Sequence, residues 1–229
     1  MLSLKWRGLF VVLALAGCKG VMKPAVPASE FSLEAQNEIT QTTIDGSNSQ
    51  VAVRFTVSLP GNVPPADLAK IESMAVLWPD DNTRTPILGA FEAEGDSLRA
   101  TQLLSDRPDG LSKGSYTLEV TFVDGQTTTI QTLCDGTILS APAITVLNVD
   151  STSVNMQWYA PPVYHMWEIY LERTQPAPTT VVVPPTTGTA DGGSMQVGFN
   201  YAFQPDEAYD LVMELENTCN HRVIDLPIP

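Results

Sequence analysis

The stretch Val51-Ala52-Val53-Arg54-Phe55-Thr56-Val57-Ser58-Leu59 decides the fold class of this 229-residue chain. Its large apolar side chains stand at every second position, with small, polar or charged side chains between them. Alternate side chains of a β-strand point to opposite faces, so the pattern predicts a strand with one face in a core and the other toward solvent. Pro60-Gly61-Asn62 follows directly and ends the strand.

Similar segments follow along the chain, and the signal for helices is weak. From Phe31 onward, runs of strand-forming residues are separated by turn residues; the clearest are Ile71 to Trp78, Thr85 to Ala93, Ser97 to Leu104, Tyr116 to Phe122 and Gln126 to Leu133. Asp124-Gly125 between the last two runs is a two-residue hairpin signal. Short strands at this spacing predict an all-β fold made of β-sandwiches.

One run in the first half carries a family resemblance. Leu111-x-x-Gly114-x-Tyr116-x-Leu118-x-Val120 is similar to the penultimate strand of many bacterial immunoglobulin-like domains. The resemblance implies an immunoglobulin-like β-sandwich over residues 31–134, and it covers one edge of that domain.

Two motifs in the second half resemble those of fibronectin type III domains. Trp158 stands three residues before Pro161, as a core tryptophan of the family's second strand stands before a proline. Phe203, Pro205 and Tyr209 match the run that enters the family's sixth strand and forms its tyrosine corner. The resemblance implies a second, fibronectin type III-like β-sandwich over residues 135–229, in tandem with the first.

The segment from Gln175 to Gly193 departs from the fibronectin type III pattern. It is longer and richer in Pro, Thr and Gly than the family's usual connection. We expect an exposed, partly extended loop, with Val181-Val182-Val183 as a candidate edge strand.

The N-terminus predicts a location. A basic start precedes the apolar run from Gly8 to Ala14, which is the order found in secretory signal peptides. Leu15-Ala16-Gly17-Cys18 then resembles the lipobox of bacterial lipoproteins. The resemblance implies that residues 1–17 are a cleaved signal peptide and that Cys18 carries the lipid anchor. About 10 apolar residues are too few for a transmembrane helix, which needs about 20.

The residues after the lipobox extend this prediction. Residues 18–30 contain two prolines and no periodicity, so we expect a lipidated tether. Lys19 follows Cys18, in place of the aspartate that tends to retain lipoproteins at the inner membrane of diderm bacteria. The resemblance therefore implies a protein of the bacterial cell envelope, anchored at the outer membrane with its body on the periplasmic or the surface face.

The charge balance excludes one class of partner. The formal net charge is −14, and it becomes −16 without residues 1–17, which hold two basic and no acidic residues. A basic footprint for nucleic acid is therefore missing, and we expect no nucleic-acid partner.

The cysteines are three in number. With Cys18 assigned to the lipid, Cys134 and Cys219 remain, an even pair in an oxidising compartment. The fibronectin type III resemblance implies that both sulfurs lie at the junction of the two domains, and we expect a disulfide between them. Two separately buried thiols are the alternative.

Motifs for catalysis or metal binding are not found in the sequence. It contains no Gly-x-Ser-x-Gly, His-Glu-x-x-His, Walker-type or dinucleotide-binding pattern. Two histidines, His165 and His221, are too few ligands for a zinc site. Asp80-Asp81-Asn82 and the segment 92–96 offer oxygen ligands but match no known calcium loop, and charged turns between strands are the commoner explanation. We expect no catalytic residues, no metal and no cofactor.

Aromatic residues give a candidate binding surface, formed by Tyr164, His165 and Tyr170. We expect a non-catalytic structural, adhesive or protein-binding component of an envelope assembly. Its expected partners are the membrane, through the lipid anchor, and other envelope or surface proteins. The alternative is a carbohydrate-binding surface lipoprotein, with glycans as the ligand.

Overall fold

The structure is a computed structural model that describes residues 24–80, 83–105, 107–138, 140–160, 165–189 and 193–228. Within these ranges it consists of strands β1 to β15, one helical turn α1 (Pro65–Leu68) and one 3-10 turn η1 (Ala28–Glu30). The predicted all-β sandwich fold is therefore confirmed. No helix in the described ranges is long and apolar enough to cross a membrane.

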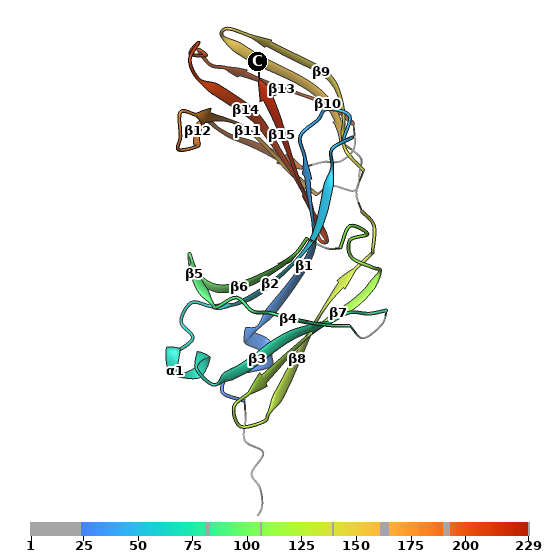
Figure 1. Ribbon diagram of the computed structural model, residues 1–229, viewed down its shortest axis with the longest axis vertical. Coiled ribbons are helices and arrows are strands. Elements are labelled where there is room, and N and C mark those ends of the chain that lie inside the picture. The colour runs from blue at the N-terminus through green and yellow to red at the C-terminus, as the bar shows by residue number, and fades with distance from the viewer. Residues whose placement is uncertain are drawn as a thin grey trace, which may run out of the picture.

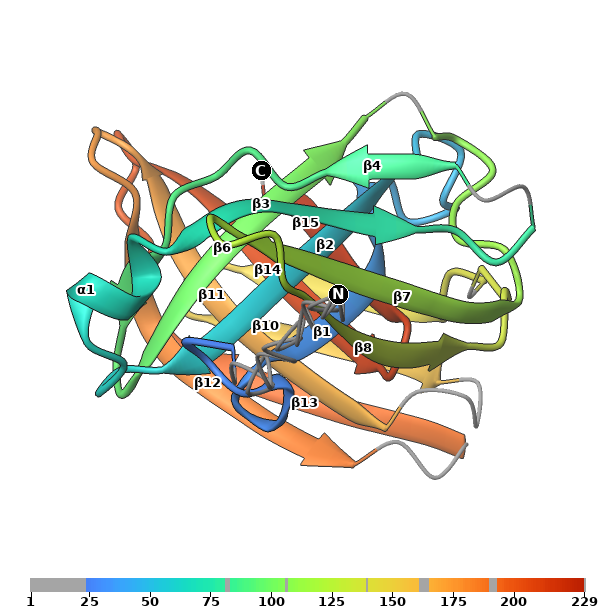
Figure 2. The ribbon, with the colours of Figure 1, turned by 90° about the horizontal axis from the view of Figure 1, so that it is seen from below.

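The N-terminal sandwich has two layers. One layer has the strand order β1-β2-β6-β5, and the other has the order β4-β3-β7-β8. Figure 2 shows the second layer in front of the first. The bounds are β1 Ser32–Gln41, β2 Gln50–Pro60, β3 Ile71–Leu77, β4 Arg84–Pro86, β5 Glu92–Glu94, β6 Ser97–Leu104, β7 Gly114–Phe122 and β8 Thr127–Cys134.

The C-terminal sandwich also has two layers. The order β13-β10-β9 forms a three-stranded sheet, which faces strands in the order β12-β11-β14-β15. The bounds are β9 Ala143–Asp150, β10 Ser153–Ala160, β11 Met166–Gln175, β12 Thr180–Thr189, β13 Gly193–Asn200, β14 Ala208–Asn217 and β15 Asn220–Ile228.

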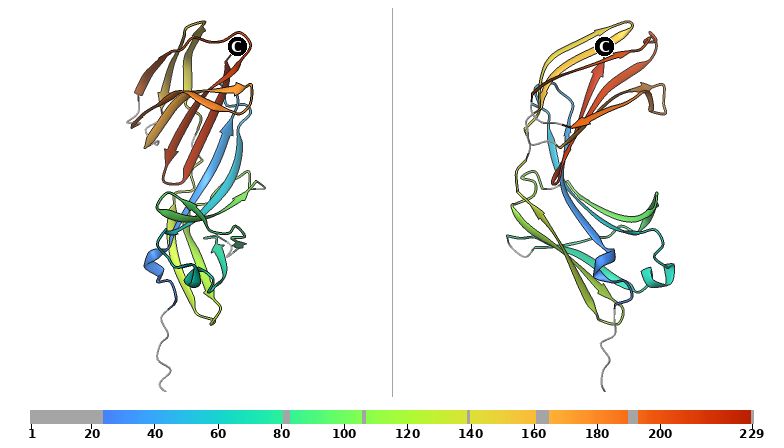
Figure 3. Two further views of the ribbon diagram at one scale, coloured as in Figure 1. Left: turned by 90° about the vertical axis from the view of Figure 1, so that its left-hand side faces the viewer. Right: turned by 180° about the vertical axis from the view of Figure 1, so that it is seen from behind.

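The two sandwiches share one sheet. β1 pairs in parallel with β15, from Asn37 opposite Asn220 to Gln41 opposite Ile224. This ladder joins one layer of each sandwich into an eight-stranded sheet with the order β12-β11-β14-β15-β1-β2-β6-β5. Figure 1 shows this sheet curving into a C whose open side is its uncovered face, and Figure 3 shows the sandwiches stacked end to end. We call the uncovered side the concave face.

The first core lies under β2. Val53, Phe55, Val57 and Leu59 of β2 are at most 2% exposed, as their alternation predicts. The ring of Phe55 lies 5.6 Å from that of Trp78 in an edge-to-face arrangement, and Tyr116 completes the cluster. Burial of such rings contributes more than their area alone, because edge-to-face pairs attract electrostatically.

The second core is separate and centres on Trp158. This side chain is fully buried in β10 and packs edge to face on Trp167 of β11, with ring centroids 5.7 Å apart. The inward residues Ile169, Leu171 and Leu211 are fully buried around it. Trp158 is therefore a core residue, as the fibronectin type III resemblance implies.

A tyrosine corner is present in each sandwich. The hydroxyl of Tyr209, at the start of β14, accepts a hydrogen bond of 3.2 Å from the backbone N–H of Gln204 and donates to Glu207. In the first sandwich, the hydroxyl of Tyr116 in β7 donates to the carbonyl of Ser112 at 3.0 Å. Both bonds hold a connection against the strand that follows it, as this corner does in sandwich folds.

Cys134 and Cys219 form a disulfide bond, which is the pair that the sequence analysis predicts. Cys134 ends β8 of the first sandwich, and Cys219 lies in the turn between β14 and β15 of the second. Their Cα atoms are 5.6 Å apart, and both residues are buried. The bond ties the end of one sandwich to a hairpin of the other.

A buried pair of asparagines lies at the start of the β1–β15 ladder. Asn37 and Asn220 are fully buried, and Nδ2 of Asn37 donates to Oδ1 of Asn220 at 2.9 Å. Oδ1 of Asn37 accepts from the backbone N–H of Leu111 at 2.7 Å, and Nδ2 of Asn220 donates to the carbonyl of Thr137 at 3.0 Å. The pair therefore joins two strands and two connections. Gly110 permits this approach, because its φ is +69° and a Cβ there would lie 2.5 Å from Oδ1 of Asn37.

Three segments differ from the sequence expectations. The end of the expected tether is packed, since Val26 is 1% exposed within the first core. The expected strand from Thr85 to Ala93 is wrong: β4 and β5 are separate because the chain crosses there from one layer to the other. The loop expected after Gln175 is wrong over Thr180–Thr189, which pairs with β11. The candidate edge strand at Val181-Val182-Val183 lies within this strand and is confirmed.

Removing the disulfide tests how strongly the sandwiches are tied together. A Cys134→Ser, Cys219→Ser double variant loses a cross-link over 85 residues. We expect the free energy of unfolding to fall by up to about 4 kcal/mol in the chain-entropy model. Urea unfolding followed by tryptophan fluorescence measures this. An unfolding midpoint equal to that of the wild type would show that the bond contributes nothing.

Candidate functional site

The sequence predicted a binding surface at Tyr164, His165 and Tyr170. Tyr164 lies outside the described residues, as does the lipidation residue Cys18. His165 is exposed directly before β11, and its backbone N–H donates to the carbonyl of Glu216 at 2.8 Å. Tyr170 lies half-buried on β11, with its hydroxyl donating to Glu214 at 2.8 Å. The structure shows no contact between His165 and Tyr170 in the part of the chain it describes.

Tyr170 instead ends a chain of polar side chains that crosses five strands of the concave face. Arg54 of β2 forms an ion pair with Glu38 of β1 at 2.7 Å. The other oxygen of Glu38 lies 3.0 Å from Nδ1 of His221 on β15. Nε2 of His221 lies 3.2 Å from Glu214 of β14, which accepts from Tyr170. We call these five residues the polar chain.

The polar chain crosses the boundary between the two sandwiches. Glu38 lies directly opposite His221 in the parallel ladder, so their contact follows from the register. Gln36, two residues before Glu38 on β1, makes a second connection across the boundary. It is 1% exposed, accepts a hydrogen bond from Arg54 and donates one to Glu216 at 3.2 Å. The same ladder that joins the backbones therefore also joins side chains of β2 and β1 to those of β14.

His221 is the cationic centre of the polar chain. Hydrogen bonds to Glu214 and Glu38 raise its pKa to about 9, against the opposing effect of burial. The bond to His221 in turn lowers the pKa of Glu214. The imidazole is therefore charged at neutral pH, with both ring nitrogens engaged by carboxylates. A ring held in this way serves as a structural link and is unsuited to act as a general base.

Beyond the polar chain, the concave face of the second sandwich is acidic. Glu172 of β11 stands directly opposite Asp210 of β14, and Asp225 of β15 lies on the same face. Burial raises the pKa of each of these three carboxyls. Mutual repulsion adds to the effect at Glu172 and Asp225. Like charges directly opposite one another destabilise a sheet. Positive charges bound to this face would therefore stabilise it.

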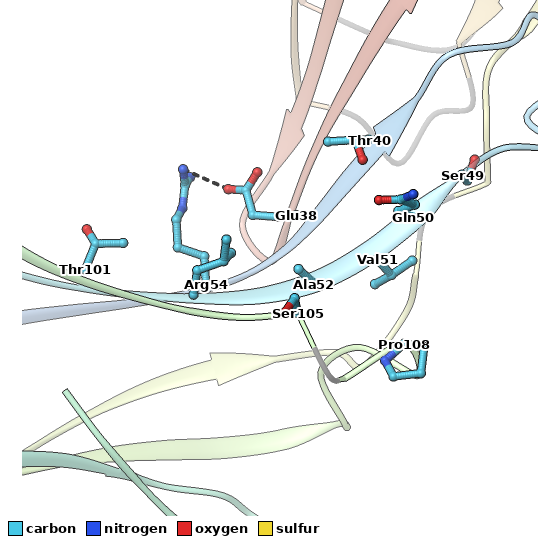
Figure 4. A pocket seen from close by; sticks show the side chains of 11 residues that line it. Glu38, Thr40, Ser49, Gln50, Val51, Ala52, Arg54, Thr101, Ser105 and Pro108 are labelled. Carbon is cyan, nitrogen blue, oxygen red and sulfur yellow. Dashed lines mark ion pairs between the residues drawn. The ribbon is translucent and has the colours of Figure 1, made fainter. Parts of the chain in front are cut away.

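A groove opens beside the polar chain, on the half of the face that belongs to the first sandwich. Its volume is about 780 Å³. Figure 4 shows Arg54 and Glu38 on one side of it and Val51 and Pro108 at its other end. Leu103 also lines it and is 54% exposed. The groove thus offers an ion pair, apolar surface and backbone of β2 within one concavity.

The described residues hold no group of three or more His, Cys, Asp or Glu side chains that could bind a metal ion. Of the acidic turns considered for calcium, Asp81 and Asn82 lie outside the described residues. Residues 92–96 form β5 and the turn into β6, where Glu94 pairs with Arg99 at 2.9 Å. The cysteines of the described ranges, Cys134 and Cys219, are joined to each other.

Comparison with known proteins gives only a remote likeness. No family model matches the sequence, and no curated protein matches it. Among solved structures, the chain is similar to the FN1–FN3 domains of chicken CNTN1, with 12% sequence identity and a TM-score of 0.34. The match covers 85% of this chain and 68% of that chain. A likeness at this level says nothing about a partner or an activity.

The polar chain predicts a specific dependence of stability on pH. The pKa of His221 is about 9 in the folded chain, above its ordinary value of 6.5, so folding takes up a proton. Its contribution is complete below pH 6.5 and is lost as the pH rises through 9. We expect the wild type to lose on the order of 1–3 kcal/mol more than His221→Gln between pH 6 and pH 9.5, since solvent screens part of the interaction.

Urea unfolding at both pH values measures this difference. His165→Gln, at an exposed histidine that is not part of the polar chain, serves as the matched control. Parallel pH profiles of the wild type and His221→Gln would contradict the assignment.

Proposed function

We propose that the chain is a non-catalytic, lipid-anchored component of a bacterial cell envelope that binds another envelope or surface protein. The observation that carries the proposal is the continuous eight-stranded sheet, which gives the two sandwiches one shared, uncovered face. Such a face presents a fixed shape to a partner, and pre-organised surfaces bind with a smaller loss of conformational entropy.

Three connections support the rigidity that the proposal needs. They are the Cys134–Cys219 disulfide, the buried Asn37–Asn220 pair and the ion pairs of the polar chain. Each joins the first sandwich to the second or braces the strands beside the junction. A structural or adhesive component transmits force or position, so a stiff junction suits it better than a flexible linker.

The proposed contact surface is the concave face around the groove. Charged residues across an interface mainly set specificity and the rate of encounter, whereas exposed apolar residues add affinity. The concave face carries both, with Leu103 beside the Arg54–Glu38 pair and an acidic region on the second sandwich. A partner with basic residues would supply the missing counter-charges.

The location follows from the lipobox resemblance and remains part of the proposal. Residues 1–17 form the signal peptide. Residues 18–30 form the lipidated tether, with the lipid on Cys18. The sandwiches of residues 31–134 and 135–229 follow. With Lys19 after the cysteine, we place the anchor in the outer membrane. The described chain starts at the end of the molecule away from the second sandwich, which supports a membrane-proximal first sandwich (Figure 1).

A cysteine variant tests the anchor. In a diderm host, the full chain should fractionate with the outer membrane, and mass spectrometry of the mature N-terminus should show acyl groups on Cys18. Cys18→Ala should remove the acyl groups and the membrane association, because all the acyl chains of the proposed anchor are carried by this residue. Membrane association without acylation would refute the lipid anchor.

Site-specific photo-cross-linking tests the protein contact. A photoreactive residue at Thr101, exposed in the groove, should give a discrete protein adduct in the intact envelope. The same residue at Thr129, exposed on β8 of the first sandwich, should not. Equal adducts at both positions, or none at Thr101, would contradict the proposed surface.

A further inference from the structure

The three-stranded sheet of the second sandwich is almost without charge. β9, β10 and β13 have eight residues each, and Asp150 is their one charged residue. Asp150 ends β9 and accepts hydrogen bonds within its own turn, from the backbone N–H of Thr152 at 2.8 Å and the hydroxyl of Ser153 at 2.8 Å. In a chain with a net charge of −14, such neutrality over an entire sheet is unexpected.

Burial does not explain this neutrality. The inward residues Val154, Met156 and Trp158 fill the second core, but the residues between them on β10 point outward and are exposed. Exposed outward positions of a soluble protein commonly carry charges, which favour solubility. Here the outward face is rich in amides and hydroxyls. Besides Asp150, its exposed polar residues are Thr145, Asn148, Asn155, Gln157, Tyr159, Ser194, Gln196 and Asn200, with the small residues Ala143 and Gly198 between them.

Several of these amides have unused hydrogen-bonding groups. Gln157 donates to the hydroxyl of Ser194 at 3.2 Å, and Asn155 donates to Ser153 at 3.3 Å. The side chains of Asn148 and Gln196 make no hydrogen bond to other described residues. An amide group offers two donors and two acceptor lone pairs, so this face presents donors and acceptors side by side.

Tyr159 is the aromatic residue of this face, and it is 48% exposed. Its cross-strand neighbours are Ser194 on β13 and Ala143 on β9. Both neighbours are small, so they leave the tyrosine ring standing above the sheet. A ring in this position can stack against a flat apolar surface of a ligand.

We propose that the outward face of β9, β10 and β13 binds an uncharged polysaccharide. Each hydroxyl of a sugar both donates and accepts a hydrogen bond, as the amides of this face do, and the C–H face of a pyranose ring stacks on an aromatic ring. The absence of charge matches a neutral ligand, whereas a basic protein or a polyanion would meet no counter-charge here. An extended chain of sugars also fits a flat sheet.

This glycan face is distinct from the surface that the sequence suggested for carbohydrate. The hydroxyl of Tyr170 is bonded to Glu214 and surrounded by carboxylates on the concave face, whereas Tyr159 lies on the opposite layer of the sandwich. Figure 1 shows β9 and β10 on the outer side of the C and at the end away from η1. The proposal is independent of the protein contact proposed for the concave face.

Affinity electrophoresis of the full chain in detergent tests the proposal. Native gels contain one of four neutral polysaccharides (hydroxyethyl cellulose, laminarin, mannan or dextran), with polygalacturonate as the charged counterpart. We expect at least one neutral polymer to retard the protein. Tyr159→Ala should weaken the binding about tenfold, the loss expected when about 1.4 kcal/mol of stacking is removed. Gln196→Ala should weaken it by about threefold, in line with the loss of one neutral hydrogen bond.

The matched control is Gln131→Ala. Gln131 is an exposed glutamine on the outward face of β8, in the other sandwich, and its variant should bind as the wild type does. Thermal unfolding of each variant checks that the fold is retained. The proposal is overturned if none of the four neutral polymers retards the wild type, if polygalacturonate alone does, or if folded Tyr159→Ala and Gln196→Ala both bind unchanged.

Discussion

The buried pair Asn37 and Asn220 is the constraint on which the arrangement of the two sandwiches depends. Each amide must find its partners inside the protein, because a buried donor or acceptor without one costs about 1–3 kcal/mol. The pair meets this demand only where the two residues face each other and where Leu111 and Thr137 approach. A slip of β15 by one residue along β1 would turn Asn220 to the other face and leave Asn37 without its partner. The asparagines therefore specify the register, and the register specifies how one sandwich stands on the other.

The two exposed sheet faces of the second sandwich differ in how many charged side chains they carry. On the concave face, charges are dense and partly satisfied across strands, with His221 holding two carboxylates together. On the outer face, Asp150 is the one charge, and it is used within its own turn. Both faces belong to strands with the same alternation of inward and outward residues, so the difference lies wholly in the choice of outward side chains. Outward side chains do not have to fit the core. Their identity can therefore be set by the partners that they bind.

Local patterns predicted most of the strands but could not predict their partners. The alternation around Phe55 and the hairpin signal at Asp124-Gly125 correspond to β2 and the β7–β8 turn, where Gly125 has a φ of +78°. Alternation predicts which side chains of a strand share a face, but it does not predict which other strand pairs with that strand. The ladder between β1 and β15 joins residues 183 positions apart, and Asn37 reads as a surface residue because asparagine is seldom buried. The polar chain was missed for the same reason, since its members meet only once the register is known.

The parallel ladder also places a demand on how the protein is made. β1 leaves the ribosome or a translocation channel well before its partner β15, with the other described strands between them. Until β15 is available, β1 presents an unpaired backbone edge, which is a template for joining other chains. The shared sheet therefore cannot be completed before β15 is made, and a molecule truncated before Asn220 would keep β1 as an open edge. The first sandwich has its own core, but the backbone edge of its strand β1 is paired only by β15 of the second sandwich.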